Sequence, residues 1–473
     1  MWFHSFEFLV FAPIVLLGHA LLNGQALRVW LLVMSYIFYG WGQPWACGLL
    51  VASSLLDFLV TLRLDVASSP RARKAWLLLS VVGNLGLLGT FKYLPFLART
   101  INRASGALGW DLELAVPQVA LPPGISFYTF QTMSYTIDVY RRQMKACRSF
   151  TTMALFVAYF PQLVAGPIER ATKLLPQLVT KQPRSAQDVM AGISRILWGL
   201  MKKLVFADWL GLFVNQVYVA PSSASGGELL LATYAFAFQI YLDFSAYSDI
   251  AIGLGRIMGI RITENFRWPY LARNLSEFWR RWHISFSTWL RDYLYIPLGG
   301  SHRGPRRTVI NVFLVMFLGG LWHGAANTYI LWGLWIGLGL ALFHGYATLT
   351  SRQRSDMNPV RWRDVPGVLL TFHWMLISWV FFRSQSVGEA FAILGRIAQP
   401  FGQAPTVSPE VTMRTLVFLI IVVLAHLLRG SGLGLSWERL KSPAAIGAFW
   451  GGMIVCMATL FAPEREPFIY FQF

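Results

Sequence analysis

The chain has 473 residues, of which 55% are apolar and only 13% carry a charge, and its mean hydropathy is +0.50. Soluble domains carry about 25% charged residues, so this composition excludes a soluble globular protein and is typical of a multi-pass membrane protein. The formal net charge of +18 would suit nucleic-acid binding, but in a membrane protein lysine and arginine gather in cytoplasmic loops beside anionic lipid. We therefore expect a lipid bilayer as the partner and no nucleic acid.

Apolar runs of about the length of a membrane span follow one another along the whole chain. They lie near residues 7–22, 27–42, 44–63, 75–98, 122–140, 151–167, 190–219, 228–258, 308–322, 325–348, 366–383, 413–429 and 444–462. Several are shorter or more polar than a simple span of roughly 20 apolar residues, so we predict about ten to twelve crossings together with re-entrant or interfacial segments. No lysine or arginine precedes the first run, which is therefore predicted to be an uncleaved span.

Clusters of basic residues predict the orientation of the chain. They occupy residues 71–74, 141–148, 170–203, 352–363 and 429–441. The loop at 220–228, in contrast, is nearly uncharged. Because basic loops stay in the cytoplasm, we predict that this loop, the region 384–412 and the C-terminal segment PEREPFIYFQF lie on the outer side of the membrane.

Two predicted membrane segments are rich in polar side chains. The sequence QIYLDFSAYSD at 239–249 holds Tyr241, Asp243, Ser245, Tyr247 and Asp249. Ionisable residues inside a span usually face the interior of the bundle or a watery cavity, so this span is predicted to line one. The sequence at 121–142, LPPGISFYTFQTMSYTIDVYRR, starts with a Pro-Gly pair, which favours a re-entrant or tilted segment.

An arginine-rich insert at 259–307 follows the predicted span that ends near Met258. The predicted orientation places this insert on the cytoplasmic side. Residues 275–295 within it are predicted to form one amphipathic helix, with Ser276 as N-cap, Glu277 paired with Arg281 four residues on, and Pro297 beyond its end. In such a helix His283 lies on the apolar stripe with Trp279, Phe286, Leu290 and Leu294.

A second histidine, His323, lies in the apolar sequence FLGGLWHGAANTYILWGLWIG. The glycines around it, Gly319, Gly320 and Gly324, predict a chain break or a close helix approach, and Gly333 and Gly337 predict helix packing. A histidine at membrane depth is a functional candidate. The alternative is a structural histidine in a packed core, and this alternative stays open for His283. We expect a structural role for the remaining histidines, His4, His19, His302, His344, His373 and His426.

The motifs WRRWHISFSTWLRDYLYIPLGG and GGLWHGAANTYILWG resemble those of the membrane-bound O-acyltransferase family. The stretches LPPGISFYTFQTMSYTIDVYR, YFPQLVAGPIER, FQIYLDFSAYSDIAIGLGRIMGIRITENFRWPYLARNLSEFWRRWH and PFIYFQF strengthen the resemblance. It covers most of the chain and points to the bacterial branch that acetylates exopolysaccharides such as alginate. The resemblance implies one all-α polytopic domain over residues 1–473, a bundle of about ten to twelve transmembrane helices with re-entrant or interfacial helices around a central tunnel.

The resemblance also implies an O-acetyltransferase of the inner membrane that takes acetyl groups from cytosolic acetyl-CoA, with no bound cofactor and no metal. It assigns His323 as the catalytic histidine and His283 as a second functional histidine on the donor side. We expect the donor phosphates to meet Arg280, Arg281 and Arg291. The side chains expected to line the tunnel are Trp282, Asp292, Trp322, Asn327, Tyr241 and Asp243.

Asn327 stands where this branch more often has tryptophan, which leaves the acceptor open. The implied partners are a periplasmic acetyltransferase of the SGNH-hydrolase type and the machinery that makes and exports the polymer. Alternatives within the enzyme class are acetylation of cellulose or another polymer and D-alanyl transfer to teichoic acid. A secondary transporter is the alternative from another class, although the inverted repeats typical of transporters are not visible.

Overall fold

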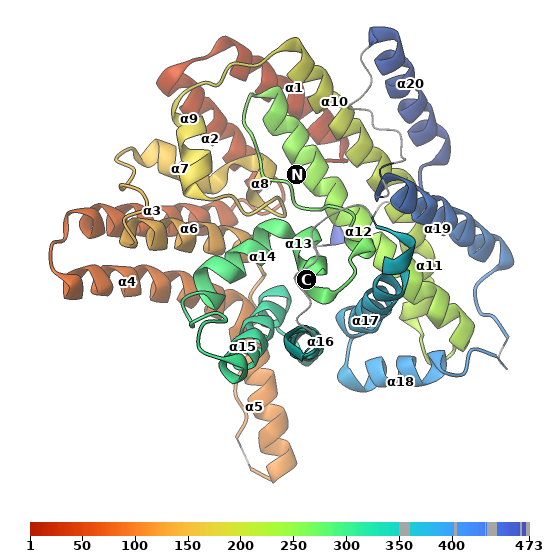
Figure 1. Cartoon of the computed structure of the whole chain (residues 1–473). Coiled ribbons are helices and arrows are strands. Elements are labelled where there is room, and N and C mark those ends of the chain that lie inside the picture. The colour runs from red at the N-terminus through yellow and green to blue at the C-terminus, as the bar shows by residue number, and fades with distance from the viewer. Residues whose placement is uncertain are drawn as a thin grey trace. The chain divides into compact units, whose positions relative to one another are not determined.

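The computed structural model describes residues 1–110, 112–349, 360–401, 404–430, 432, 442–463 and 466–469, and within these ranges the chain is helical and has no strand. The α-helices are α1 (Phe6–Leu21), α2 (Gly24–Gly40), α3 (Ala46–Val66), α4 (Pro70–Leu88), α5 (Leu94–Leu108), α6 (Ile125–Tyr140), α7 (Phe150–Ala158), α8 (Phe160–Leu163), α9 (Ala171–Val179), α10 (Ala186–Met201), α11 (Asp208–Val219), α12 (Gly226–Ile257), α13 (Leu275–Arg281), α14 (Ile284–Leu290), α15 (Pro305–His323), α16 (Asn327–Leu349), α17 (Val365–Arg383), α18 (Val387–Ile397), α19 (Pro409–Gly430) and α20 (Pro443–Leu460) (Figure 1). The π-helical segments are η1 (Gly89–Tyr93), η2 (Lys202–Ala207) and η4 (Arg291–Tyr295), and the 3₁₀ segments are η3 (Pro269–Leu271) and η5 (Trp362–Asp364).

Seven helical segments in the described part of the chain are long and apolar enough to cross a membrane. They are Ala46–Val66, Pro70–Leu108, Gly226–Ile257, Asn327–Ala347, Trp362–Arg383, Pro409–Gly430 and Pro443–Leu460. Their burial differs widely, since 78% of the apolar window of α12 is covered by protein but only 6% of that of α20. An apolar helix with so little cover needs lipid around it. The prediction of an all-α polytopic membrane protein is confirmed, and the total number of crossings stays a prediction.

Several predicted elements differ from the structure in their limits. The apolar run at 151–167 is not one helix, because α7 ends at Ala158 and the short α8 starts at Phe160. Pro161 explains this break, since proline has no N–H to donate and its ring collides with the carbonyl four residues earlier. Parts of the predicted basic loops, at 352–359 and 433–441, and the last residues of the C-terminal segment, 470–473, lie outside the described residues.

Packing divides the chain into two compact units. The first comprises Met1–Ile193 with Ile250–Thr263, and the second comprises Ser194–Asp249 with Glu264–Phe473. Both candidate histidines belong to the second unit.

Within the first unit, α3, α4 and α6 pack against one another around a buried polar cluster. The carboxylate of Asp57 on α3 accepts hydrogen bonds from Ser80 and Asn84 on α4 and from Thr136 on α6, the last two at 2.8 and 2.9 Å. The predicted polar segment at 121–142 therefore contains a helix whose hydroxyl groups stabilise helix packing. Its re-entrant or tilted course stays a prediction.

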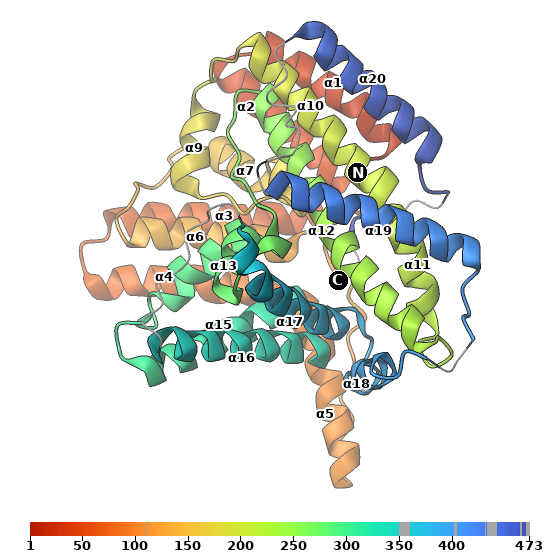
Figure 2. The same cartoon turned by 45° about the vertical axis from the view of Figure 1, so that its right-hand side comes forward.

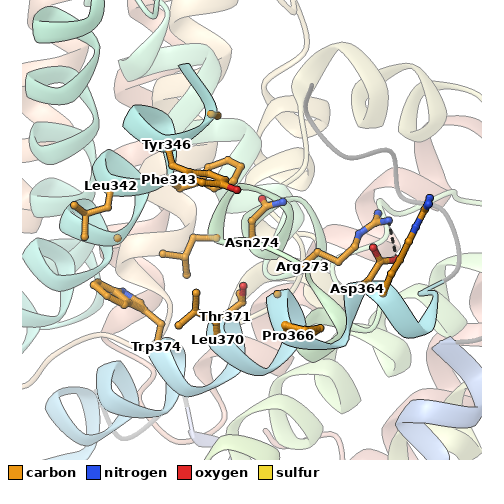
Figure 3. A pocket seen from close by; sticks show the side chains of 15 residues that line it. Arg273, Asn274, Leu342, Phe343, Tyr346, Asp364, Pro366, Leu370, Thr371 and Trp374 are labelled. Atoms are coloured by element: carbon orange, nitrogen blue, oxygen red, sulfur yellow. Dashed lines mark ion pairs between the residues drawn. The ribbon is translucent and has the colours of Figure 1, made fainter. Parts of the chain in front are cut away.

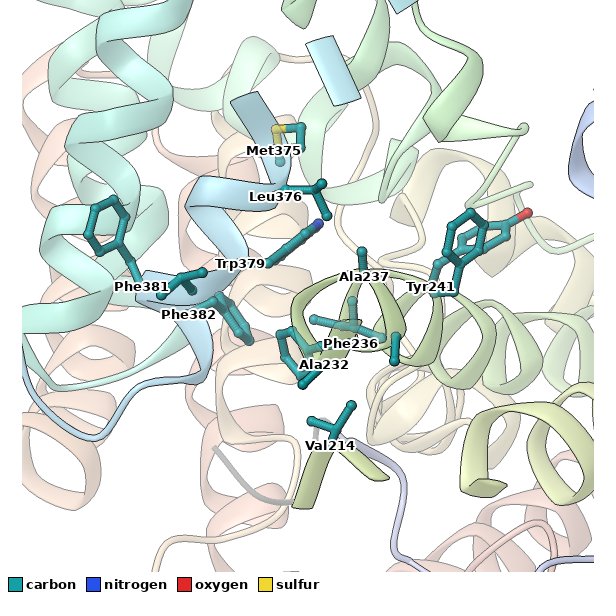
Figure 4. Packing of buried hydrophobic residues seen from close by; sticks show 14 of the residues in the cluster. Val214, Ala232, Phe236, Ala237, Tyr241, Met375, Leu376, Trp379, Phe381 and Phe382 are labelled. Atoms are coloured by element: carbon teal, nitrogen blue, oxygen red, sulfur yellow. The ribbon is translucent and has the colours of Figure 1, made fainter. Parts of the chain in front are cut away.

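Within the second unit, α11, α12 and α17 enclose an apolar core. Figure 4 shows Phe236 of α12 close to Phe382 of α17, with Val214 of α11 beside them. Trp379 of α17, which is 1% exposed, fills the space toward α13. Helices α15 and α16 lie side by side, and α16 also packs on α17 (Figure 2). This arrangement fixes the helix ends that carry the candidate site.

Candidate functional site

His283 lies at an interruption of the helix that periodicity predicts over residues 275–295. Helix α13 ends at Arg281, His283 has a left-handed backbone conformation with φ +42° and ψ +55°, and α14 begins at Ile284. The prediction of one continuous helix was therefore wrong, although the chain is helical on both sides of the break. A side chain other than glycine in this conformation costs about 1–3 kcal/mol, so the surrounding structure must hold it in place.

Backbone hydrogen bonds to residues 265–267 hold this break open. The Arg267 N–H donates to the carbonyl of Arg281 at 2.8 Å, and the Ile284 N–H donates to the carbonyl of Asn265 at 2.9 Å. In a continuous helix the Arg281 carbonyl and the Ile284 N–H would instead bond backbone groups four residues away in the same helix. Tertiary contacts thus replace the helical hydrogen bonds that the local sequence favours.

The start of α13 is also different from the prediction. Its N-cap is Asn274, whose side chain accepts from the Glu277 N–H at 2.9 Å, and not Ser276. The predicted pair of Glu277 and Arg281 is confirmed at 2.6 Å, and Arg273 bonds the same carboxylate at 2.9 Å. Burial alone would raise the pKa of Glu277, but the hydrogen bonds from these two arginines lower it.

The Asn265 side chain positions His283. The Asn265 Oδ1 atom lies 3.2 Å from His283 Nδ1, and it accepts from the Ser285 N–H at 3.2 Å and the Ser285 hydroxyl at 2.9 Å. Because the backbone N–H can only donate, this amide atom is the oxygen, and neutral His283 therefore carries its proton on Nδ1. Its Nε2 atom then has a basic lone pair. His283 lies outside the candidate spans, and burial lowers its pKa to about 3, which keeps the ring neutral at physiological pH.

His323 is the last residue of α15, and α16 begins at Asn327. The predicted break after His323 is therefore confirmed. The predicted glycine packing is also present, because a Cβ atom at Gly320 would collide with the carbonyl of Tyr329, and one at Gly333 with the carbonyl of Met316. Glycine is required at these positions for α15 and α16 to approach closely.

Both histidines contact the same two aromatic rings. The ring centroids of His283 lie 5.0 Å from Phe286 and 5.9 Å from Trp322, and those of His323 lie 5.5 and 4.9 Å from the same rings. His283 is fully buried and His323 is 6% exposed. The fold thus brings together two imidazoles that are 40 positions apart in the chain (323 minus 283). Their shared surroundings are apolar and exclude bulk water.

The other side chains predicted to line a tunnel take several different positions. Trp282 and Tyr241 belong to the buried aromatic core, with ring centroids 6.3 Å apart, and Trp322 belongs to the histidine cluster. Asn327 is exposed at the start of α16, and the partly exposed Asp292 bonds Arg291 at 2.7 Å. Lining of a tunnel by these residues stays a prediction.

Asp243 belongs to a buried network of ion pairs. It bonds Lys203 at 2.6 Å, and Lys203 also bonds Asp208 at 2.8 Å. The second carboxylate oxygen of Asp243 accepts the Ile469 N–H at 2.6 Å, so the C-terminal segment is tied to α12. On the next turns of α12, Asp249 pairs with Lys202 and Arg195. The two carboxylates of the segment 239–249 therefore bind partners within the protein.

The three arginines predicted to bind the donor separate into two groups. Arg280 and Arg291 line one pocket of about 280 Å³ between α13, α14, α15 and α16, together with Trp279 and His344. Arg281 is buried on the other side of α13 in its pair with Glu277. The structure therefore brings Arg280 and Arg291 together and places Arg281 elsewhere.

A larger pocket of about 650 Å³ lies between α13, α16 and α17. Figure 3 shows the pair of Arg273 and Asp364, 3.7 Å apart, at one end and the apolar side chains of Leu342 and Trp374 at the other. Neither candidate histidine lines this pocket. Among the described residues no group of histidine, cysteine and acidic side chains is arranged to hold a metal ion.

Three features of the site do not follow from the sequence patterns: Asn265, Phe286 as a ring between the histidines, and Trp332. The ring centroid of Trp332 lies 4.9 Å from that of His323. Asn265 and Trp332 lie within two motifs that carry the family resemblance, RITENFRWPY and TYILWG. This resemblance was the only signal in the sequence that could have identified them. Nothing in the local pattern distinguishes them from packing residues.

Comparisons with known proteins identify the family of this chain. The family model for the membrane-bound O-acyltransferase family matches residues 125–384, a range that includes both histidines. The chain is 36% identical to the probable alginate O-acetylase of Pseudomonas putida over the full length of both proteins. It is 41% identical to the probable alginate O-acetylase of Pseudomonas syringae, with 84% of this chain and 74% of the relative covered. The peptidoglycan O-acetyltransferase of Helicobacter pylori is 33% identical, with 81% and 77% covered.

The match of the family model spans more than half of the chain, and the relative from Pseudomonas putida is similar from end to end. The described helices and the two buried histidines fit an enzyme that works within a membrane. The chain therefore belongs to the membrane-bound O-acyltransferase family, and it is a multi-pass membrane protein with O-acyltransferase activity.

Proposed function

We propose that this protein takes acetyl groups from cytosolic acetyl-CoA and passes them across the inner membrane for the O-acetylation of alginate. The relatives named alginate O-acetylases support the acetyl group and the polymer, since one of them matches over its whole length. The peptidoglycan O-acetyltransferase is similar over less of the chain. The basic loops support a cytoplasmic donor side, because they predict that the arginine-rich insert faces the cytosol.

The observation that carries the chemistry is the pair of buried imidazoles around Phe286 and Trp322. In the proposed reaction His323 takes the proton of the acceptor hydroxyl, whose oxygen attacks the thioester carbonyl carbon. The carbon–sulfur bond then breaks, and the leaving CoA thiolate receives that proton from His323. His283 orients the donor, because its Nε2 lone pair can accept a hydrogen bond from an amide N–H of the acyl-CoA arm. Its neutral state and fixed tautomer suit this role.

Arg280 and Arg291 are proposed to hold the phosphates of acetyl-CoA. Guanidinium groups bind phosphate oxygens through paired, charge-assisted hydrogen bonds. The two arginines line one pocket. Trp279 lines the same pocket and contacts the ring of Trp332, which lies beside His323. Arg281 has a smaller role in this proposal, because it already bonds Glu277 inside the protein.

On the outer side, we propose that the acetyl group passes to a periplasmic acetyltransferase of the SGNH-hydrolase type, which modifies the polymer. The polymer export machinery would be the second partner. The predicted outer position of 220–228 and 384–412 makes these segments the candidates for contact with that partner.

The test is the His323→Ala variant in proteoliposomes supplied with radiolabelled acetyl-CoA and an acceptor. General base catalysis typically contributes about 10²–10⁴-fold, so acetyl transfer should fall by at least about 100-fold. His302→Ala removes an exposed histidine from the same half of the chain and should leave the rate unchanged. Normal acetyl transfer by His323→Ala, in protein with unchanged folding, would remove the proposed base.

The same preparation distinguishes the alternative functions. A D-alanyl transferase would need an aminoacylated carrier protein and would not use acetyl-CoA. A secondary transporter would move a solute without consuming a thioester. Acetyl transfer onto cellulose or another polymer, with none onto alginate, would keep the enzyme class and replace the acceptor.

A further inference from the structure

Two buried tryptophans near His323 have indole N–H groups without an acceptor. Trp279 is 9% exposed and Trp332 is 1% exposed, and neither Nε1 atom has a hydrogen-bond partner among the residues that the structure describes. Leaving a buried donor unsatisfied costs about 1–3 kcal/mol, so native proteins rarely do so without a reason. A bound substrate with hydrogen-bond acceptors is one such reason.

The two indoles connect the arginine pocket with the catalytic histidine. Trp279 lines the pocket that also contains Arg280 and Arg291. Its ring lies 6.0 Å from the ring of Trp332, in an edge-to-face arrangement, and the ring of Trp332 lies 4.9 Å from that of His323. The order from the surface inward is therefore pocket, Trp279, Trp332 and His323.

The chemistry of the proposed donor supplies what these groups lack. The arm of an acyl-CoA carries amide carbonyl oxygens and ends in a thioester carbonyl, all of which accept hydrogen bonds. Between the phosphates and the acyl group the arm is otherwise apolar enough to pass a wall of aromatic side chains. An indole N–H can only donate, so each tryptophan matches a carbonyl oxygen.

We infer that the N–H groups of Trp279 and Trp332 bind the acyl donor, an inference that rests on the proposed function. The Trp279 N–H donates to an amide carbonyl of the donor arm, and the Trp332 N–H donates to the thioester carbonyl next to His323. When the acceptor oxygen attacks, the thioester oxygen becomes negatively charged, and the bond from Trp332 becomes stronger. Trp332 is in this way a catalytic residue, whereas Trp279 binds ground state and transition state equally.

These two roles predict different kinetic effects. Phenylalanine keeps an aromatic ring and removes the N–H, so Trp279→Phe should raise KM for acetyl-CoA about 10-fold with kcat nearly unchanged. Trp332→Phe should lower kcat about 100-fold, the range seen when an oxyanion donor is removed. The matched control is Trp335→Phe, because the Trp335 N–H already donates to the carbonyl of Trp374 at 3.1 Å. It should leave both constants unchanged.

If Trp332→Phe does not fold, incorporation of 3-benzothienylalanine at position 332 replaces the N–H by sulfur and keeps the bicyclic shape. A loss of kcat in that variant supports the inference. Wild-type kcat and KM in the folded tryptophan variants, together with an inactive His323→Ala, would overturn the role of the indoles and leave the proposed function standing. Full activity of His323→Ala would instead remove the proposed base, and no acetyl transfer from acetyl-CoA by the native protein would remove the proposed function itself.

Discussion

Removal of the Asn265 side chain tests whether tertiary positioning of His283 matters for catalysis. Asn265→Ala removes one oxygen atom, which accepts hydrogen bonds from His283 Nδ1, the Ser285 N–H and the Ser285 hydroxyl. The bond from the Ile284 N–H to the Asn265 carbonyl is made by the backbone and remains available. The substitution therefore removes the fixed orientation of the imidazole while keeping a backbone contact at the break.

The structure permits an estimate of the cost. Each buried hydrogen bond contributes about 1 kcal/mol net, and a donor left without an acceptor costs about 1–3 kcal/mol. For three donors the loss of stability should be on the order of 3 kcal/mol. In activity we expect a fall in kcat of about 100-fold, since the proton of His283 is no longer confined to Nδ1.

A conservative variant separates positioning from a general loss of structure. Asn265→Asp keeps an acceptor for His283 and should restore much of kcat at high pH. In the native protein burial lowers the pKa of His283 to about 3, so its charge does not change between about pH 5 and 8. A carboxylate at position 265 favours the imidazolium and raises this pKa, so activity should fall as the pH is lowered through the new value.

The assay is acetyl transfer from acetyl-CoA by proteoliposomes, measured from pH 5 to pH 8, with thermal unfolding in detergent alongside. Ser248→Ala serves as the control, because it removes the partner of the Asn265 Nδ2 group, 3.2 Å away, and keeps the Asn265 oxygen that bonds His283. A wild-type kcat in folded Asn265→Ala, or an unchanged pH profile in Asn265→Asp, would refute the positioning of His283 by Asn265.

Two further substitutions test packing. Gly320→Ala should destabilise the protein strongly and reduce activity, because its Cβ atom would collide with the carbonyl of Tyr329. The control Gly345→Ala on α16 meets no atom within 4 Å and should leave the melting temperature within a few degrees of the native value. Equal melting temperatures of the two variants would contradict the close approach of α15 and α16. Lys203→Met leaves two buried carboxylates without their cation and should cost about 3–5 kcal/mol, while Arg414→Ala breaks an exposed pair and should cost less than about 1 kcal/mol. Similar unfolding temperatures for these last two variants would show that the buried network does not stabilise the fold.

The sequence by itself determined the class of the protein and the main candidates for chemistry. Long apolar runs predict helices in a membrane, because the backbone there must satisfy its own hydrogen bonds. The glycines around His323 predicted a chain break or a close helix approach, and the structure has the break after α15 as well as the close packing on α16. The pair of Glu277 and Arg281 also followed from the sequence, because positions four apart on a helix are neighbours.

Only the tertiary structure decided how His283 is held. Local periodicity describes which face of a segment is buried, and it favours one helix over 275–295 because both halves share the same stripe. The break arises from hydrogen bonds to Asn265 and Arg267, which come from a separate segment of the chain. The sequence did not indicate a role for Trp279 and Trp332 for the same reason. An indole N–H can be identified as lacking an acceptor only when the positions of its neighbours are known. The local sequence pattern predicts which side chains are buried, whereas hydrogen bonds between distant segments depend on how those segments pack.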